Sequence, residues 1–390
     1  MKPLAVYVHI PFCFVKCGYC DFNTYAGLDA LKGDYARALV REVESYRDLL
    51  AAREVTSISF GGGTPGEFPV EGLAVVIEAI RDTRTVAADA EISLEGNPGT
   101  TPLDQLVALR AAGVNRISFG AQSFDVAQLQ FLDRIHSPEA IGASVDNARR
   151  AGIESVGLDL MYGVPGQSLA SFQTSLERAI MLTPEHLSCY ALTVEEGTPL
   201  ASRIAAGEVE CPDPDLQADM YELAEERLPR SGFGHYEISN WARPGHQSRH
   251  NLVYWTDGEY VGIGAGAHGY VEGERYENIA QPRQYNRALL GRYGLAEKPA
   301  VAHAYRPDSA TAMGDWLETA LRLVAGFDPL RFATRFGCRL EDALGPVMAS
   351  AVADGLVVTE PARVRLTARG RLLHSEVVTR AIAHLSLSPV

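Results

Sequence analysis

The stretch HIPFCFVKCGYCDFNTY, residues 9–25, holds three of the six cysteines of the chain, Cys13, Cys17 and Cys20. Their spacing is C-x3-C-x2-C, which is one thiolate short of a tetrahedral zinc site. No second C-x2-C pair follows, and a redox dithiol would use only two of the three cysteines. We therefore favour a [4Fe–4S] cluster in which three irons bind thiolates and the fourth iron is open to another ligand.

The composition is typical of a globular protein with a sizeable core: 46% of the 390 residues are hydrophobic and 22% are charged. The formal net charge of -14 argues against a general affinity for nucleic acid or anionic membranes. There is no run of 18 apolar residues and no apolar signal-peptide segment, so we expect a soluble, cytoplasmic protein. Because the cytoplasm is reducing, we expect Cys189, Cys211 and Cys338 to be free thiols without a functional role and not to form disulfides.

Short apolar, β-branched runs alternate with segments of helical periodicity along the first half of the chain. The predicted strands are residues 4–10, 55–60, 90–94, 116–119, 155–160 and 186–191. The predicted helices between them include residues 34–50, 70–81, 102–112, 138–151 and 169–182. This alternation predicts right-handed βαβ units and an α/β fold with a parallel sheet.

Polar or glycine-rich clusters follow the predicted strands at the points where they end. The cysteine loop follows the first strand and GGGTPG (residues 61–66) follows the second. Glu95, Gln122 and Asp159 lie at the ends of the next three. Because carboxyl ends of parallel strands meet at one edge, as in α/β barrels, these clusters predict one shared site.

The cysteine motif, with Tyr19 before its last cysteine, resembles the signature of radical S-adenosylmethionine (SAM) proteins. The resemblance implies a partial (β/α)6 TIM-like barrel whose [4Fe–4S] cluster binds Cys13, Cys17 and Cys20, with SAM on the open iron. Taken alone, each polar residue at a strand end could be purely structural, and the glycine-rich segment could be an ordinary tight turn. The resemblance assigns SAM contacts to Tyr7, Phe22, Gly62, Gly63, Thr64, Glu95, Gln122, Arg134 and Asp159.

The motifs YVHIPFC, FGGGTP, GAQSF, DLMYGVPGQ and GIGAGAH resemble one group within the radical SAM proteins. That group contains oxygen-independent coproporphyrinogen III oxidases (HemN) and haem chaperones (HemW). The oxidases have a further cysteine where this chain has Phe22, and they have an N-terminal extension ahead of the cluster motif that is not seen here. Both departures argue against decarboxylation.

HNLVYW (residues 250–255) matches the HNxxYW motif that is proposed to bind haem in the chaperones. Imidazole is a good ligand for haem iron, and aromatic side chains offer flat apolar surfaces to a porphyrin. The structural alternative is a hydrogen-bonded histidine at a domain junction, with aromatic residues filling the interface. The resemblance gives as haem candidates His250, Asn251, Tyr254 and Trp255.

Three segments are expected: a radical SAM barrel (1–230), a glycine- and aromatic-rich extension (231–305) and a smaller helical, winged-helix-like domain (306–390). Residues 200–229 are expected to form one further helix, and residues 232–270 show no helical period. The last segment contains three predicted helices, a hairpin and a final helix. Arg365, Arg369 and Arg371 lie close together in it, but its charge is nearly balanced, which favours a barrel cap or partner surface over nucleic-acid binding.

The function that the resemblance favours is a haem chaperone, which binds haem and transfers it to an acceptor protein. The cluster and an exchangeable SAM could regulate transfer or dimerisation. The first alternative is the oxidase, in which SAM cleavage yields a radical that abstracts hydrogen from a porphyrinogen propionate before CO2 is lost. The second is a radical SAM enzyme for another substrate. Enzymatic activity stays open, as do an electron donor, a homodimer and transient contact with a membrane-bound acceptor.

Overall fold

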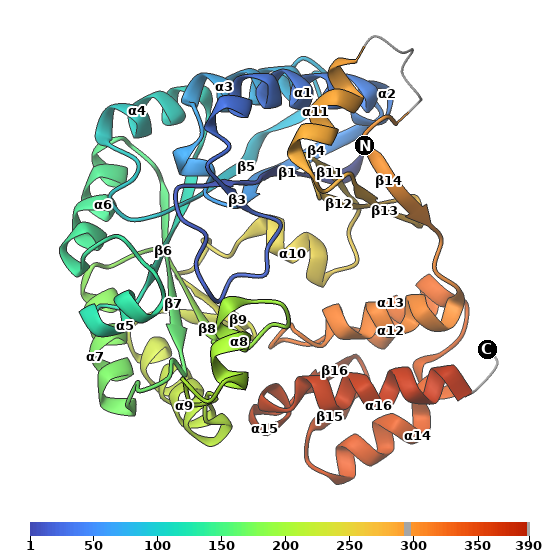
Figure 1. The fold of residues 1–390 in the computed structure, drawn as a ribbon. Coiled ribbons are helices and arrows are strands. Elements are labelled where there is room, and N and C mark those ends of the chain that lie inside the picture. Colours follow the sequence, from blue (N-terminus) through green and yellow to red (C-terminus); the bar gives the residue numbers. More distant parts are fainter. Residues whose placement is uncertain (292–297, 388–390) are drawn as a thin grey trace.

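A computed structural model describes residues 1–291 and 298–387 (Figure 1). Residues 292–297 of the predicted segment 231–305 and residues 388–390 of the predicted segment 306–390 lie outside the described ranges. Within the described ranges, no helix is both long and apolar enough to cross a membrane.

The six predicted parallel strands are confirmed and form a partial barrel (Figure 1). They are β1 (Lys2–Ile10), β4 (Arg53–Gly62), β5 (Val86–Gly96), β6 (Arg116–Gln122), β7 (Ser155–Tyr162) and β8 (His186–Ala191). Each pairs with the next in chain order, for example Val6 opposite Ile58 and Ile58 opposite Ile92. All three of these side chains are buried, as expected for a parallel sheet that is covered by helices.

Helices cover the outer face of this sheet (Figure 1). The larger ones are α1 (Lys32–Ser45), α3 (Val70–Arg81), α4 (Leu103–Ala112), α6 (Pro138–Arg150) and α7 (Leu169–Met181). Shorter ones are η1 (Asp29–Leu31), α2 (Arg47–Ala51), η2 (Pro65–Glu67) and α5 (Val126–Phe131). The predicted helix 34–50 is thus divided at Tyr46, and α4 ends at Gly113 with φ of 111°, a left-handed cap that favours glycine.

The strands of the predicted extension continue the same sheet at both edges. Beside β1 lie β11 (Tyr260–Ile263), β12 (His268–Val271), β13 (Glu274–Asn278) and β14 (Val301–Tyr305). Beside β8 lie β10 (Asn240–Ala242) and β9 (Gly234–Glu237). Helix α11 (Pro282–Leu290) packs on α1, so the barrel and this segment share one hydrophobic core.

Two expectations about helices are wrong. Residues 200–229 form two helices, α8 (Pro199–Ala205) and α9 (Pro214–Arg230), each with its own side-chain cap and with proline at its start. Helix α10 (Arg249–Trp255) lies in the segment that shows no helical period. Seven residues make only two turns, which is too short for periodicity to show, and tertiary contacts stabilise this helix instead.

The predicted C-terminal helices and hairpin are present below the barrel in Figure 1. They are α12 (Ser309–Ala320), α13 (Pro329–Phe336), α14 (Leu340–Ala353), β15 (Val357–Glu360), β16 (Arg363–Leu366), α15 (Ala368–Leu372) and α16 (His374–Leu387). This domain has its own core, centred on Trp316, whose ring meets those of Phe327 and Phe332 edge-on. It joins the barrel through an ion pair of Arg322 with the fully buried Glu237, at 3.0 Å.

Candidate functional site

The cysteine loop leaves the carboxyl end of β1 and is closed by a short parallel pair, β2 (Phe12–Cys13) and β3 (Tyr25–Ala26). Cys13, Cys17 and Cys20 are free thiols on this one loop, all partly buried. Burial raises the pKa of the Cys13 and Cys20 thiols. The predicted cluster ligands therefore lie together at the predicted edge of the sheet.

Groups from other strand ends hold the backbone of this loop. The Phe14 amide donates to Glu67 Oε2 at 2.8 Å, and the Gly18 amide donates to Asp133 Oδ2 at 2.8 Å. The Gly18 carbonyl accepts from the Leu200 amide, also at 2.8 Å. Because three separate parts of the barrel fix the loop, its shape does not depend on a bound ligand alone.

A chain of hydrogen bonds joins two of the cysteines. Arg134 donates to Cys17 Sγ at 3.7 Å and to Asn97 Oδ1. Asn97 Nδ2 donates to Thr64 Oγ1 at 3.1 Å, and Thr64 Oγ1 donates to Cys13 Sγ at 3.5 Å. This Thr64–Asn97–Arg134 chain aims hydrogen-bond donors at two sulfur atoms, and the bond from Thr64 partly offsets the burial that raises the pKa of the Cys13 thiol. Sequence reasoning missed Asn97, although it stands two residues after Glu95 in LEGNPG.

The glycine turn packs directly against the start of the cysteine loop. A Cβ atom on Gly63 would lie 2.6 Å from the Phe12 carbonyl oxygen and 2.9 Å from that of Ile10. Gly62 has φ of 111°, in the left-handed region that favours glycine. The Gly63 and Thr64 amides each donate to this backbone at 2.9 Å. The turn therefore needs glycine for the fold itself.

Two acidic side chains face the barrel mouth. Glu95 Oε2 accepts from the Gly62 amide at 3.3 Å, and Asp159 Oδ1 accepts from Ser188 at 2.7 Å and Ser118 at 2.9 Å. Burial, together with the charge of Asp159, raises the pKa of Glu95 above its usual range. A Cβ atom on Gly61 would lie 3.1 Å from Glu95 and 3.0 Å from the Tyr7 ring. Three of the predicted SAM residues, Tyr7, Gly62 and Glu95, thus lie around one turn.

Two other SAM candidates, Gln122 and Phe22, lie on other segments of the chain. Gln122 ends β6 with φ of 58°, a left-handed conformation that is uncommon for residues other than glycine. Phe22 is 62% exposed in the cysteine loop. His9, just before the loop, is buried, and its ring contacts Tyr7 OH at 3.0 Å and the Asn23 carbonyl at 2.9 Å.

The first HNLVYW residue, His250, is 2% exposed in α10. Its Nδ1 lies 3.0 Å from Ser57 Oγ and its Nε2 lies 2.8 Å from Tyr254 OH. Burial lowers the pKa of the ring to about 3, so the ring is neutral at physiological pH. In this conformation both ring nitrogens are engaged and neither is accessible to an iron atom.

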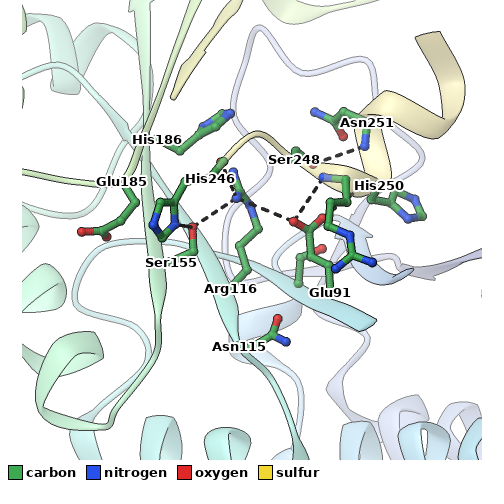
Figure 2. A network of polar contacts seen from close by, with 12 residues as sticks. Glu91, Asn115, Arg116, Ser155, Glu185, His186, His246, Ser248, His250 and Asn251 are labelled. Carbon is green, nitrogen blue, oxygen red and sulfur yellow. Dashed lines mark hydrogen bonds and ion pairs between the residues drawn. The ribbon is translucent and has the colours of Figure 1, made fainter. Parts of the chain in front are cut away.

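Helix α10 is anchored at the opposite end of the barrel from the cysteines. Figure 2 shows Arg116 and Ser155, which begin β6 and β7, together with Glu91, which lies in the middle of β5. Glu91 Oε1 accepts from the His250 amide at 3.0 Å, and Arg116 lies 3.7 Å from Glu91 and donates to Ser155 at 3.1 Å. The structure therefore does not bring the haem candidates to the rim that carries the cysteines.

The remaining haem candidates surround this junction. Tyr254 packs edge-on against the Tyr260 ring, and the Arg322 guanidinium of the C-terminal domain lies 4.5 Å from the centre of the Trp255 ring. Figure 2 shows Asn251 on α10 beside Ser248, whose hydroxyl oxygen accepts from the Asn251 amide at 3.2 Å. These contacts correspond to the structural alternative considered for the motif, a junction filled by aromatic residues.

The donor set on the cysteine loop fits a [4Fe–4S] cluster. No three His, Cys, Asp or Glu side chains in the described ranges could jointly hold one metal ion. Cysteines of such a cluster bind different irons, so they need not converge on one point. Three thiols on one loop, with donors aimed at two sulfurs, supply what the cluster requires.

A partial (β/α)6 barrel with a three-cysteine loop after its first strand defines a radical SAM protein, and the Radical SAM superfamily model matches residues 7–179. The HemN C-terminal domain model matches residues 317–373. The heme chaperone HemW of Mycobacterium tuberculosis H37Rv is 40% identical, covering 97% of this chain and 94% of that protein. HemW of Escherichia coli K12 is 36% identical, covering 98% and 99%. The chain belongs to the HemW family of haem chaperones.

A solved structure has the same architecture. Coproporphyrinogen III oxidase (HemN) from Escherichia coli, described as a radical SAM enzyme, matches with a TM-score of 0.83. The match covers 99% of this chain and 90% of that one, at 25% sequence identity. The predicted radical SAM barrel with a smaller C-terminal domain is therefore confirmed.

Proposed function

We propose that this protein binds haem, passes it to an acceptor protein, and carries a [4Fe–4S] cluster on Cys13, Cys17 and Cys20 with exchangeable SAM. The observation that carries the cluster assignment is the cysteine loop itself, whose three thiols are free and whose sulfurs face Thr64 and Arg134. Similarity over nearly the whole chain to proteins named heme chaperones supports the haem role.

When bound, the cluster would supply an open iron that SAM can chelate. Tyr7, Gly62 and Glu95 surround the turn beside the loop, where Glu95 could accept hydrogen bonds from ribose hydroxyls. The full set proposed for SAM is Tyr7, Phe22, Gly62, Gly63, Thr64, Glu95, Gln122, Arg134 and Asp159. We further propose a cytoplasmic location, a homodimer, and an electron donor if SAM is cleaved.

For haem, the motif candidates His250, Asn251, Tyr254 and Trp255 form part of the proposal. His250 could bind iron only after its ring left Ser57 and Tyr254, because both nitrogens are engaged. The oxidase function is the second candidate, favoured by the likeness to HemN. Phe22, in place of the further cysteine of the oxidases, disfavours it.

The cluster assignment is tested by replacing Cys13, Cys17 and Cys20 singly with alanine and reconstituting each variant anaerobically. We expect each to lose the visible absorbance of the cluster and most of its iron, because each thiolate holds a separate iron. Cys189→Ser, which alters a buried cysteine on β8, is the control and should retain both. Zinc without iron in the wild-type protein would contradict the assignment.

The haem role is tested by anaerobic haemin titration of the reconstituted protein, with SAM cleavage and coproporphyrinogen III turnover measured in parallel. Stoichiometric haemin binding without coproporphyrinogen turnover is expected. A wild-type protein that binds no haemin would contradict the chaperone proposal, and turnover would establish the oxidase instead.

A further inference from the structure

A groove of about 390 Å³ lies between the barrel and the C-terminal domain, away from α10. The last residues of β7 and β8, Tyr162 and Ala191, line one side of it, and Tyr221 of α9 lies beside them. Residues in and after α15 line the other side, namely Arg369, Leu372 and Leu373. The groove therefore opens at the carboxyl edge of the barrel, the same edge that carries the cysteine loop.

Packing connects the groove with the cysteine loop. Gln217, which also lines the groove, donates to the Leu192 carbonyl at 3.0 Å. Leu192 belongs to a small apolar cluster with Leu200, against which Tyr19 of the cysteine loop packs. A ligand in the groove would thus be connected with the cysteine loop through Gln217, this apolar cluster and Tyr19.

The groove is largely apolar and accessible. Leu372 and Leu373 are 36% and 39% exposed, which is uncommon for two adjacent leucines on a monomeric surface. Tyr162 and Tyr221 also line the groove, but they are almost fully buried, so the two leucines supply most of its accessible apolar surface. Such a surface suits a planar hydrophobic molecule better than a sugar or a nucleotide phosphate.

The charged side chains that line the groove, Arg369 and Arg371, are both arginines. Arg371 donates to Glu225 at 2.8 Å and is thereby neutralised. Arg369 forms no ion pair with any described residue, and its described side-chain hydrogen bond is a contact of 3.3 Å with the Asp354 carbonyl. A guanidinium carries five donors, so Arg369 can still bind a carboxylate at two points.

A second groove, about 460 Å³ in volume, borders the end of α10 but is less suited to an anionic ligand. Arg335 is paired with Asp257 at 3.0 Å, and Arg331 donates to the Thr256 carbonyl at 2.7 Å, a shorter contact than the 3.3 Å one of Arg369. The carboxylate of Asp257 also lines that groove and would repel a carboxylate ligand.

We propose that the groove at the barrel mouth binds the haem cargo. The macrocycle lies against Leu372 and Leu373, and Arg369 binds a propionate carboxylate. This inference rests on the proposed haem-chaperone function and assigns a site to its cargo. It places haem on the rim of the cysteine loop, whereas the His250 ring is buried inside the barrel, 6.3 Å from the Tyr7 ring.

The test is a haemin titration of the full-length, cluster-reconstituted protein and its Arg369→Glu variant, followed by the Soret band. Reversing the charge removes the charge-assisted hydrogen bonds and adds repulsion, so we expect haemin affinity to fall by about tenfold or more. Arg363→Glu is the matched control, because Arg363 is exposed on β16 of the same domain and does not line the groove. Leu373→Glu should weaken binding as well, through the apolar wall.

A second probe isolates the carboxylate contact. Haemin whose propionates are esterified should bind the wild-type protein more weakly than free haemin and should not distinguish wild type from Arg369→Glu. Unchanged cluster absorbance and far-ultraviolet circular dichroism would show that the variants are folded.

Equal haemin affinity of wild type, Arg369→Glu and Leu373→Glu would overturn the proposed site while leaving the chaperone function intact, above all if His250→Ala abolished binding. Haemin binding beyond one equivalent that no substitution alters would be non-specific and would likewise overturn it. No binding to the wild-type protein would contradict the function itself.

Discussion

At the scale of single residues, Asn97 connects the two halves of the proposed cluster environment. Its amide nitrogen donates to Thr64 and its amide oxygen accepts from Arg134. With its oxygen already accepting from Asn97, the Thr64 hydroxyl can direct its own proton to Cys13. Asn97 thereby orients both side chains that face cluster sulfurs, although it touches neither sulfur itself.

We expect Asn97→Ala to bind a [4Fe–4S] cluster with a reduction potential more negative than that of the wild type. Hydrogen bonds to cluster sulfurs favour the reduced, more negatively charged state, and the substitution leaves both donors unoriented. The measurement is a redox titration followed by electron paramagnetic resonance. Asn147→Ala, on the outer helix α6, is the control, and identical potentials in all three proteins would refute the role of Asn97.

At the scale of elements, helix α10 is stabilised by side chains that lie outside it. Ser248 caps its first turn, and Glu91 of β5 accepts from the Arg249 and His250 amides at 3.2 and 3.0 Å. A carboxylate at a helix N-terminus is favoured by the helix dipole, and the nearby Arg116 balances its charge. A seven-residue segment would not hold this helix by itself.

We expect Glu91→Ala to lower the free energy of unfolding by about 3–5 kcal/mol, since removing one partner leaves the other charge of a buried pair uncompensated. Urea denaturation monitored by circular dichroism measures the change. Glu54→Ala, which removes an exposed carboxylate at the start of β4, should cost less than about 0.5 kcal/mol. A loss for Glu91→Ala no larger than that of this control would show that the pair does not support the helix.

At the scale of the whole molecule, Glu42 joins segments that are more than 200 residues apart in the chain. From α1, its buried carboxylate accepts from the Gly264 amide at 2.8 Å, Asn278 Nδ2 at 2.7 Å and the Tyr285 hydroxyl. Burial raises the pKa of Glu42 to about 7, although these three hydrogen bonds favour the charged form. The contact links the barrel to the strands and helix that extend its sheet.

This pKa makes stability depend on pH. Between about 4.5 and 7 the folded protein retains a proton on Glu42 that the unfolded chain has lost, so stability falls as pH rises through this window. The loss from this group is about 3 kcal/mol for that difference in pKa. We expect Glu42→Gln to lose less stability than wild type between pH 5 and 7.5 in urea denaturation. Glu44→Gln, an exposed site on α1, should behave as wild type, and equal slopes in all three would contradict the assignment.

Much of the fold could be read from the sequence because its signals are local. The six parallel strands, the capped helix end at Gly113 and the C-terminal helices and hairpin each depend on patterns within a few residues. Helix α10 escaped prediction because its caps come from Ser248 and from Glu91, about 160 residues away. No sequence pattern in residues 231–305 predicted that their strands would extend the sheet at both edges.

The sequence by itself determined the class of protein and the loop with its three thiols, because C-x3-C-x2-C places these groups within eight residues of each other. Only the tertiary structure decided which groups surround them. Arg134 reaches Cys17 from the segment after α5, and Asn97 holds it from the end of β5, whereas the His250 ring is directed into the barrel, where it meets Ser57. Spacing along the chain specifies local ligand sets, but which end of the barrel a distant residue occupies depends on strand order, burial and hydrogen bonding in the folded protein.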